Sequence, residues 1–552
     1  MLSKRIKIVL LCVLALVGLS FPLASITTSY FEISKNLDIF TSMLKELDSY
    51  YVDEIDAAKS MRYAMDGMLE KLDPYTNYIS EAEMEGYKLQ TTGKYGGIGA
   101  TIRKEKEYIS INEPYEGFPA SKAGLITGDI ILEIEGKSMK GKESEAVSDL
   151  LRGAPGTSVT VKISRPLRNE TFSKTITREE IKLKSVPYYG MLKDGIGYIR
   201  LNQFTDNCTR EVSNALKELK ANTTLRGLVL DLRGNPGGLL NEAVSMCNLF
   251  VEKEQLVVST KGKVATWDKA YKTMSEPTDL NLPLVVLTSH GSASASEIVS
   301  GVMQDYDRGL VVGQNTYGKG LVQTTRNLSY GTKLKLTTAK YYIPSGRCIQ
   351  AIDYSQRNED GSVGKVADSL KTAFKTRNGR KVYDGGGVAP DVALLPREYA
   401  NVTIGLLQKQ LIFEYASLYK SKHQSIAKAR DFSLTEAEYE EFLVWLQSQK
   451  LDYTTKSDEL VKKLMEQAEK DKMDAATIAE IVALKNKLNA DKANDLIQHR
   501  SDVKETLENE IVSRYYFQAG RIEKSLVSDV EAIEAIKLLE DTERYQKILR
   551  GN

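Results

Sequence analysis

Apolar residues recur with helical spacing in the first part of the chain. Between Tyr30 and Leu72 they follow one face of a helix, and Asp73-Pro74 ends the pattern. The pattern predicts an N-terminal helical segment over residues 29–90.

The pattern then changes to short β-rich runs separated by glycines, which predicts a compact β-rich domain over residues 91–183. Further on, the buried-strand runs Leu228–Leu232 and Leu284–Thr288 alternate with helical stretches. This alternation is typical of an α/β unit, which we place at residues 184–398.

The end of the chain is helical by pattern. Residues 399–552 contain no proline, and two S-x-x-E boxes, Ser433/Glu436 and Ser528/Glu531, predict helix starts. Alternating charges and apolar stripes indicate a packing or oligomerisation element rather than a catalytic one.

An apolar run with a positive flank opens the sequence. Lys4, Arg5 and Lys7 precede an uncharged run from Ile8 to Ala24. A signal peptide and an uncleaved membrane anchor both fit residues 1–28. In either case the rest of the chain crosses the membrane. We therefore expect an exported protein, periplasmic or attached to the cytoplasmic membrane on its outer side.

Composition narrows the class of protein. At about 150 residues per domain, 552 residues suggest three or four domains. The 75 Lys+Arg balance 74 Asp+Glu, which gives no electrostatic signature of a nucleic-acid binder. Three histidines, and four cysteines without C-x-x-C spacing, provide no zinc pattern. We expect no metal, no organic cofactor and no nucleic-acid partner.

One serine in a turn of small residues is a candidate nucleophile. The segment Leu284–Gln304 has the pattern of a buried strand, a turn and an amphipathic helix, with Ser294 in the turn. Free amides at a helix start can stabilise an oxyanion. Ser294 and Glu297 also form an S-x-x-E capping box, and by itself the segment favours this structural role.

A serine nucleophile needs a base. His290 is the only histidine before residue 400, and it lies in the same turn as Ser294, where chain geometry keeps its ring from serving as base. A lysine whose pKa is lowered by burial is the other route. Lys319 follows a strand and lies between Gly318 and Gly320, which leave it unobstructed.

Two other interpretations of this lysine are available. Residues 313–319 nearly match the phosphate-binding pattern G-x-x-x-x-G-K-[ST], but Gly320 replaces the hydroxyl residue, and the following LVQTTRNL predicts a strand rather than a helix. A solvated surface lysine is the simpler alternative.

A third turn follows the strand in Leu228–Leu240, LVLDLRGNPGGLL. Its glycines allow backbone amides to approach a ligand closely, as an oxyanion hole requires. An ordinary strand-to-helix turn fits this segment equally well.

In combination, these motifs resemble the carboxyl-terminal processing peptidases, also called tail-specific proteases. The resemblance rests on LVLDLRGNPGG, GSASASEIVSG, VVGQNTYGKGLVQ and TTAKYYIPSGRCIQ, in that order. It extends over roughly residues 30 to 395. Pro236 departs from it, because relatives often have a further glycine there.

The resemblance implies a Ser/Lys dyad. The nucleophile then falls on Ser294, the general base on Lys319 and the residue that positions the lysine on Gln323. The oxyanion amides fall on Gly238 and Ala295. The core is expected to have a spiral-like α/β fold of the crotonase or Clp-protease type.

The β-rich domain resembles the PDZ domain of the same family. Gly97, Ile98, Gly99 and Ala100 would form its carboxylate-binding loop. Successive amides in a glycine loop can bind a terminal carboxylate, and the strand Ala100–Arg103 offers an edge for β-augmentation. A glycine-rich hairpin without a ligand is the alternative.

Overall, the sequence predicts a multidomain α+β protein: an N-terminal helical segment, a β-rich PDZ domain, an α/β protease core and a helical C-terminal domain. We expect a serine endopeptidase that binds apolar C-terminal tails of proteins or peptides, and a homo-oligomer formed through the helical tail. The rivals are a catalytically inactive PDZ scaffold and, more distantly, a phosphate-binding ATPase.

Overall fold

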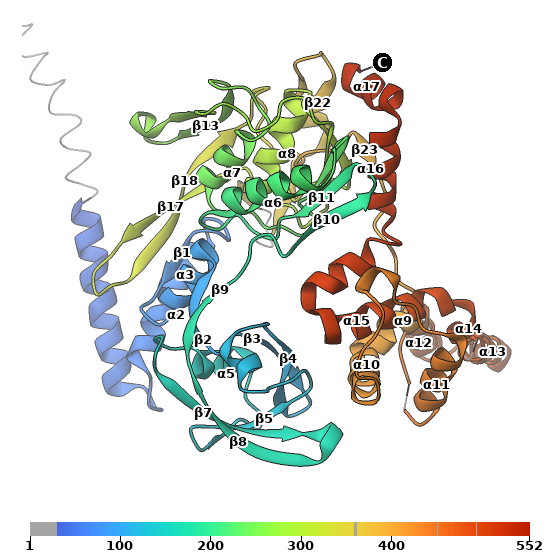
Figure 1. The fold of residues 1–552 in the computed structure, drawn as a ribbon. Helices are drawn as coiled ribbons and strands as arrows, with labels where there is room; N and C mark the ends of the chain where they lie inside the picture. The colour runs from blue at the N-terminus through green and yellow to red at the C-terminus, as the bar shows by residue number, and fades with distance from the viewer. Residues whose placement is uncertain (1–29, 358–361, 450, 493, 552) are drawn as a thin grey trace, which may run out of the picture. The chain divides into compact units, whose positions relative to one another are not determined.

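A computed structural model describes residues 30–357, 362–449, 451–492 and 494–551 (Figure 1). The predicted export segment, residues 1–28, lies outside the described residues. Within the described ranges, no helix combines the length and apolar character needed to cross a bilayer.

The chain divides into two units. The first comprises Met1–Tyr78 and Thr325–Leu336, and the second comprises Ile79–Thr324 and Thr337–Asn552. The described part of the first unit contains a helix over residues 30–50 and α2 (Ala57–Glu70). The predicted N-terminal helical segment is thus confirmed.

The β-rich domain is a six-stranded antiparallel sheet in the second unit. Its strand order is β3-β4-β5-β7-β8, with β6 paired to β5, so β3 lies at an edge. The strands are β3 (Ala100–Glu105), β4 (Tyr108–Pro114), β5 (Ile130–Ile134), β6 (Lys137–Ser138), β7 (Ser158–Arg165) and β8 (Glu170–Thr177). The short helices α4 (Pro119–Lys122) and α5 (Ser144–Leu151) complete it, and α3 (Met84–Thr92) and the pair β2 (Lys94–Gly97) and β9 (Glu179–Lys182) flank it in sequence.

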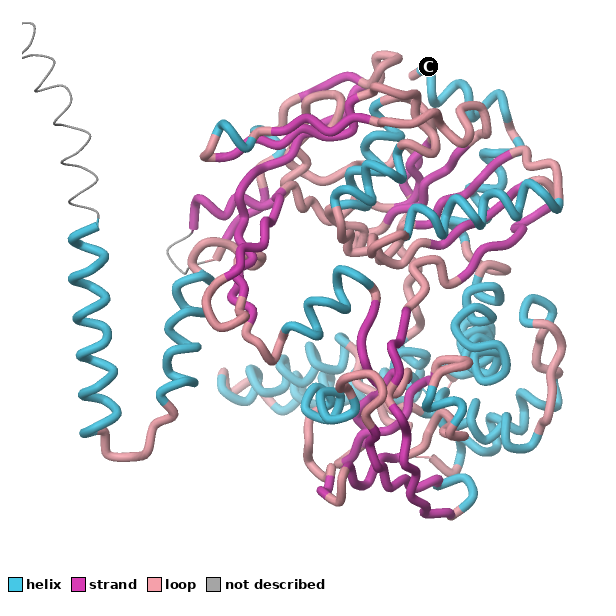
Figure 2. Tube along the Cα trace, turned by 60° about the vertical axis from the view of Figure 1, so that its left-hand side comes forward, coloured by secondary structure: helices cyan, strands magenta, loops and turns pink. Residues whose placement is uncertain are grey.

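The protease-like core is built on a second six-stranded sheet, in which strands and helices alternate along the chain (Figure 2). Its order is β10 (Tyr188–Lys193), β11 (Ile196–Arg200), β12 (Gly227–Asp231), β15 (Leu284–Thr288), β16 (Leu310–Gly313) and β23 (Val392–Ala393). All strands from β11 onward are parallel. Every residue of β12 and β15 is buried, which explains why both appear as continuous apolar runs.

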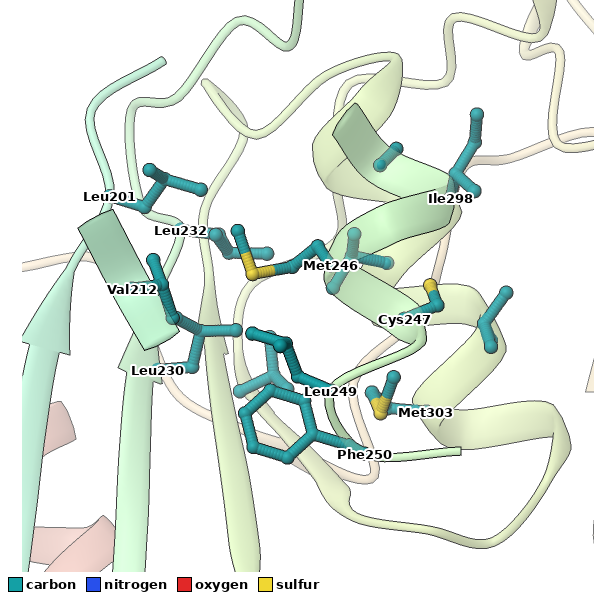
Figure 3. Packing of buried hydrophobic residues seen from close by; sticks show 14 of the residues in the cluster. Leu201, Val212, Leu230, Leu232, Met246, Cys247, Leu249, Phe250, Ile298 and Met303 are labelled. Carbon is teal, nitrogen blue, oxygen red and sulfur yellow. The ribbon is translucent and has the colours of Figure 1, made fainter. Parts of the chain in front are cut away.

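One face of this sheet is covered by helices that are close to it in sequence. They are α6 (Cys208–Asn222), α7 (Leu240–Cys247) and α8 (Ala295–Asp305). Figure 3 shows Val212 and Met246 packed with Leu230 and Met303 in this hydrophobic cluster. The alternation predicted from sequence is confirmed.

The opposite face is covered by the last two helices of the chain, α16 (Val530–Glu540) and α17 (Thr542–Arg550). Their residues Ala535, Leu538 and Tyr545 share a buried cluster with Val229 and Val285 of the sheet. Helices α16 and α17 are therefore part of the protease-like core.

The remaining C-terminal helices form separate clusters, apart from Ile522 near the end of α15, which belongs to the cluster on the sheet. One contains residues of α9 (Asn401–Gln408), α10 (Leu411–Lys422), α11 (Glu436–Gln447) and α15 (Arg500–Ser525), and a smaller one contains residues of α12 (Lys456–Lys470) and α13 (Ala475–Lys492). The short α14 (Asp495–Gln498) precedes α15. The sequence-based domain over residues 399–552 does not distinguish these helices from α16 and α17.

Smaller strands complete the described fold. They are β1 (Asn77–Ile79), β13 (Leu256–Gly262), β14 (Lys269–Lys272), β17 (Leu321–Asn327), β18 (Lys333–Tyr342), β19 (Ile352–Arg357), β20 (Val363–Lys365), β21 (Ala373–Lys375) and β22 (Lys381–Tyr383). Within the second unit, β13 pairs with β14 and with the end of β18.

Both helix starts predicted in the tail were wrong in detail. The N-cap of α11 is Thr435, whose capping-box partner is Glu438, while the Ser433 hydroxyl donates to Glu508 at 2.9 Å. The capping-box pattern occurs again two residues later, at Thr435 and Glu438, and this second box caps the helix. Ser433 instead donates a hydrogen bond to the buried Glu508 carboxylate.

The N-cap of α16 is Asp529 rather than Ser528. Its carboxylate accepts the amides of Glu531 and Ala532, both at 3.0 Å. A charged carboxylate is a stronger acceptor than the Ser528 hydroxyl, which donates to Glu505. Glu531 is therefore not a capping residue, and its side chain has another partner.

Candidate active site

Ser294 lies immediately before α8 in a strained backbone conformation. Its φ of 55° and ψ of −112° are rare for a residue with a Cβ atom. Its amide donates to the Glu297 carboxylate at 2.8 Å, so the half of the predicted capping box that Glu297 supplies is present. The serine turn is thus fixed by a buried carboxylate three residues on.

Glu297 also fixes the turn that contains Lys319. Its carboxylate accepts the Thr316 hydroxyl at 2.6 Å and the amides of Gly318 and Lys319 at 2.7 and 2.8 Å. Glu297 is fully buried, and burial raises the pKa of its carboxyl group despite these donors. One side chain therefore connects the backbones of Ser294 and Lys319.

Tyr341 on β18 connects the same two turns a second time. Its buried hydroxyl lies 3.1 Å from the carbonyl oxygen of Ser294 and 2.7 Å from that of Lys319. The structure thus brings the predicted nucleophile and the predicted base together through two independent links.

The glycines beside Lys319 are required by packing. Gly318 has a φ of 88°, and a Cβ atom there would approach Ala351 Cβ to 2.3 Å. Lys319 itself is half-buried, and strand β17 begins two residues after it. A phosphate-binding loop would continue into a helix at this point, so the structure disfavours that alternative.

Gln323 lies on β17, four residues after Lys319. Its side-chain amide donates to the Thr337 hydroxyl on β18 at 3.1 Å. This contact holds the Gln323 side chain against the neighbouring strand β18, close in sequence to the lysine turn.

The glycine turn after β12 packs directly against the serine turn. Gly237 has a φ of 95°, and a Cβ atom there would lie 2.8 Å from both Ser294 Cβ and the Ala295 amide nitrogen. The Ala293 amide donates to the carbonyl oxygen of Asn235 at 3.0 Å, which joins the two turns.

Two backbone amides at this junction have no acceptor among the described residues. They belong to Gly238, next to the contact point, and to Ala295, the first residue of α8. First-turn amides of a helix have no intrahelical partner. The two amides predicted as oxyanion donors are thus available beside Ser294.

Sequence reasoning missed Asp231 and Arg233. Asp231 is fully buried at the end of β12 and accepts the Tyr198 hydroxyl at 2.6 Å and Arg233 Nη2 at 2.7 Å. Burial alone would raise the pKa of Asp231, but Arg233 and Arg200 outweigh it and lower the pKa to about 2. A charged residue inside the apolar run LVLDL was the signal that could have found this pair.

His290 is exposed in the serine turn, in agreement with its interpretation as a loop residue. The described residues contain no cluster of His, Cys, Asp and Glu side chains suited to a metal ion.

A separate groove lies in the β-rich domain, between the edge strand β3 and helix α5. It encloses about 350 Å³. Its lining is mostly apolar and includes Ile98, Ala100, Ile102, Tyr115 and Leu151. The predicted loop residues Ile98 and Ala100 thus line a groove beside an unpaired strand edge, the arrangement that β-augmentation requires.

The other two loop residues shape the backbone at this point. Gly97 ends β2, and Gly99 has a φ of 74°, where a Cβ atom would approach Phe118 Cβ to 2.5 Å. The loop therefore depends on glycine at residue 99.

The fold and the site together define a serine peptidase core joined to a PDZ domain. Comparison with known families agrees with this class. Residues 195–358 match Peptidase family S41, residues 110–165 match the PDZ domain, and residues 402–539 match "Probable PDZ-protease, C-terminal helical domain".

Similar proteins of known family show which peptidase family the chain belongs to. The chain is 37% identical over 325 residues to the carboxy-terminal-processing protease of Bartonella bacilliformis, which covers 58% of this chain and 73% of that protein. It is 36% identical over 341 residues to a probable CtpA-like serine protease of Staphylococcus haemolyticus. This match covers 61% of this chain and 66% of that protein. The chain therefore belongs to the family of carboxy-terminal processing proteases and is a serine peptidase.

Among solved structures, the photosystem II D1 C-terminal processing protease is 27% identical and covers 64% of this chain and 88% of its own. The TM-score is 0.35, too low to support an argument from the superposition.

Proposed function

We propose that this peptidase cleaves proteins with a Ser294/Lys319 dyad after its PDZ groove has bound an apolar C-terminal tail. The observation that carries the proposal is the double link between the two turns. Glu297 and Tyr341 each contact the backbone of both residues, at distances between 2.7 and 3.1 Å.

In the first half of the reaction, Ser294 Oγ attacks the scissile carbonyl carbon while neutral Lys319 Nζ takes its proton. The amides of Gly238 and Ala295 stabilise the oxyanion. The C–N bond then breaks, and the leaving amine receives the proton from Lys319. In the second half, a water molecule attacks the acyl carbon while Lys319 takes its proton. The bond from the acyl carbon to Ser294 Oγ then breaks, Lys319 returns the proton to Oγ, and the new carboxyl terminus leaves. Gln323 is proposed to position the lysine.

The groove between β3 and α5 accounts for substrate choice. A tail adds to the free edge of β3, its carboxylate meets amides of the Gly97–Ala100 loop, and its apolar side chains enter the cavity. The partners we propose are therefore unfolded proteins or peptides with apolar C-termini.

The dyad is tested with a labelled, unfolded casein carrying an apolar C-terminal extension. Ser294→Ala and Lys319→Ala should each lower cleavage by at least about 10⁴-fold. Ser275→Ala, an exposed serine of the same core outside the serine, lysine and glycine turns, is the matched control. Undiminished cleavage by Ser294→Ala would contradict the proposal.

The rival, an inactive tail-binding scaffold, predicts binding without turnover. A fluorophosphonate probe separates the two: labelling at Ser294, mapped by mass spectrometry, excludes the scaffold.

Residues 1–28 support the further proposal that the protein is exported, with the chain after this segment outside the cytoplasmic membrane. Protease protection of spheroplasts tests this location. Assembly through the helical tail into a homo-oligomer is likewise proposed, and analytical ultracentrifugation measures it.

A further inference from the structure

The glycine turn that contains Gly238 begins at Arg233, and two acidic residues at the start of α16 contact this arginine. Arg233 Nη1 donates to Asp529 at 3.0 Å and to Glu531, and Arg233 Nη2 lies 2.8 Å from the other Asp529 oxygen. These contacts join residues almost 300 positions apart in sequence.

The cluster is largely shielded from water. The side chains of Arg233, Asp529 and Glu531 are 14%, 16% and 10% exposed, and Asp231, which shares the guanidinium, is fully buried. Ion pairs in such surroundings are screened far less than surface pairs. Their geometry therefore constrains where Arg233 can lie.

Hydrogen bonds join the residues on either side of Arg233 to the segment that contains Ser294. Next to it, the Leu232 carbonyl accepts the Ser292 hydroxyl at 2.8 Å, and the Gly234 amide donates to Ser289 at 3.0 Å. Asn235 continues the turn: its carbonyl accepts the Ser296 hydroxyl at 2.9 Å. A shift of Arg233 would thus be transmitted to the turn that presents Gly238 beside Ser294.

Glu531 also contacts the strand before the lysine turn. Its Oε1 accepts Gln314 Nε2 at 3.3 Å, directly after β16. The Glu531 carboxylate therefore contacts residues just after both β12 and β16. The glycine turn begins at the end of β12, and the lysine turn begins at the end of β16.

We propose that Asp529 and Glu531 are positioning residues for catalysis: by fixing Arg233 they hold the Gly238 amide in register with Ser294. This rests on the dyad and oxyanion assignments above. Docking of α16 then completes the oxyanion hole as well as the hydrophobic core.

The test uses the full chain with Asp529→Asn and Glu531→Gln combined. Asparagine still caps a helix, so the helix start is preserved while both negative charges facing Arg233 are removed. We expect kcat to fall about tenfold or more with KM nearly unchanged, because a displaced oxyanion donor acts on the transition state. The affinity of a peptide boronate, which forms a tetrahedral adduct with Ser294, should fall in parallel with kcat.

The matched control is Glu540→Gln at the other end of α16. It removes the 2.7 Å pair with Lys193 on the same sheet and should leave kcat and boronate affinity unchanged. If the double variant does not fold, Glu531→Gln alone, with Asp529 retained, should show the same slower turnover.

A folded variant, double or single, with wild-type kcat and boronate affinity overturns the inference. So does a parallel loss in Glu540→Gln, which would indicate a general structural effect. Cleavage that survives Ser294→Ala refutes the proposed function itself, and the two failures are therefore distinguishable.

Discussion

The two faces of the core sheet are covered by helices of different origin. On one face, α6, α7 and α8 lie between the strands in sequence, as in any alternating α/β unit. On the other, α16 and α17 return from the end of the chain, after more than 100 residues of separate helical structure. The difference shows that the core of this peptidase does not end where its recognisable motifs end.

We expect the largest effect from removing α16 and α17, the helices that cover the second face of the core sheet. A chain ending at Val527 lacks α16 and α17 and leaves Val229, Val285 and Leu287 exposed to water. We expect loss of cooperative unfolding, measured by circular dichroism during heating. Replacing α12 and α13 with a short Gly/Ser linker is the control, because their cluster is separate. Wild-type melting of the truncated chain would show that the second face needs no cover.

Substitution of one buried leucine on each face compares how much the two faces contribute to the free energy of unfolding. Leu216 on α6 and Leu538 on α16 are both fully buried. Truncation to alanine should destabilise the protein by about 3 kcal/mol in each case, measured by urea unfolding. Ile481→Ala, in the α12–α13 cluster, should leave the core transition unchanged. A cost near zero for Leu538→Ala alone would show that the second face is loosely packed.

Asp231, at the end of β12, tests the electrostatic side of the comparison. Its folded pKa of about 2 lies below the ordinary value of 3.8. Its stabilisation is therefore fully present above pH 3.8 and is lost as the pH falls toward 2. Asp231→Asn should cost about 2 kcal/mol at neutral pH, and the difference from wild type should shrink below about pH 4.

Unfolding free energies at pH 7, 5 and 3 measure this difference. Leu216→Ala, which removes no charge, is the control and should show no such trend. A difference that is constant across the series would disprove the assigned role of Arg233 and Arg200.

We expect the smallest effect on stability from an exposed ion pair at the edge of the second face, which we call its rim. The pair Lys193–Glu540 is 55% and 34% exposed. Glu540→Gln should change the unfolding free energy by no more than about 0.5 kcal/mol, because exposed pairs are well solvated. A cost near the ~3 kcal/mol expected for a buried leucine would mean that this rim contributes as much as the hydrophobic cluster.

The sequence allowed the local parts of this structure to be predicted. The buried runs at Leu228 and Leu284, the edge strand at Ala100 and the strand after Lys319 all follow from patterns within a few residues. The proximity of Ser294 and Lys319 was expected only from family resemblance, because nothing local indicates the links through Glu297 and Tyr341.

The second face could not be predicted for a related reason. The box Ser528/Glu531 satisfied a local capping rule. In the structure, however, Asp529 is the N-cap, and Glu531 accepts a hydrogen bond from Arg233, about 300 residues away in sequence. Pairing over such a distance leaves no periodic pattern in one sequence. The apolar stripes of the helical tail indicated packing, but they did not indicate which surface the tail packs against.

The return of α16 and α17 to the sheet also sets an order of events during synthesis. A chain that emerges with its N-terminus first presents the strands β11 to β16 long before residues 530–550 are available to cover them. Domains fold as units once their parts are present. The peptidase core is therefore completed only once residues 530–550 have emerged, long after the strands that they cover.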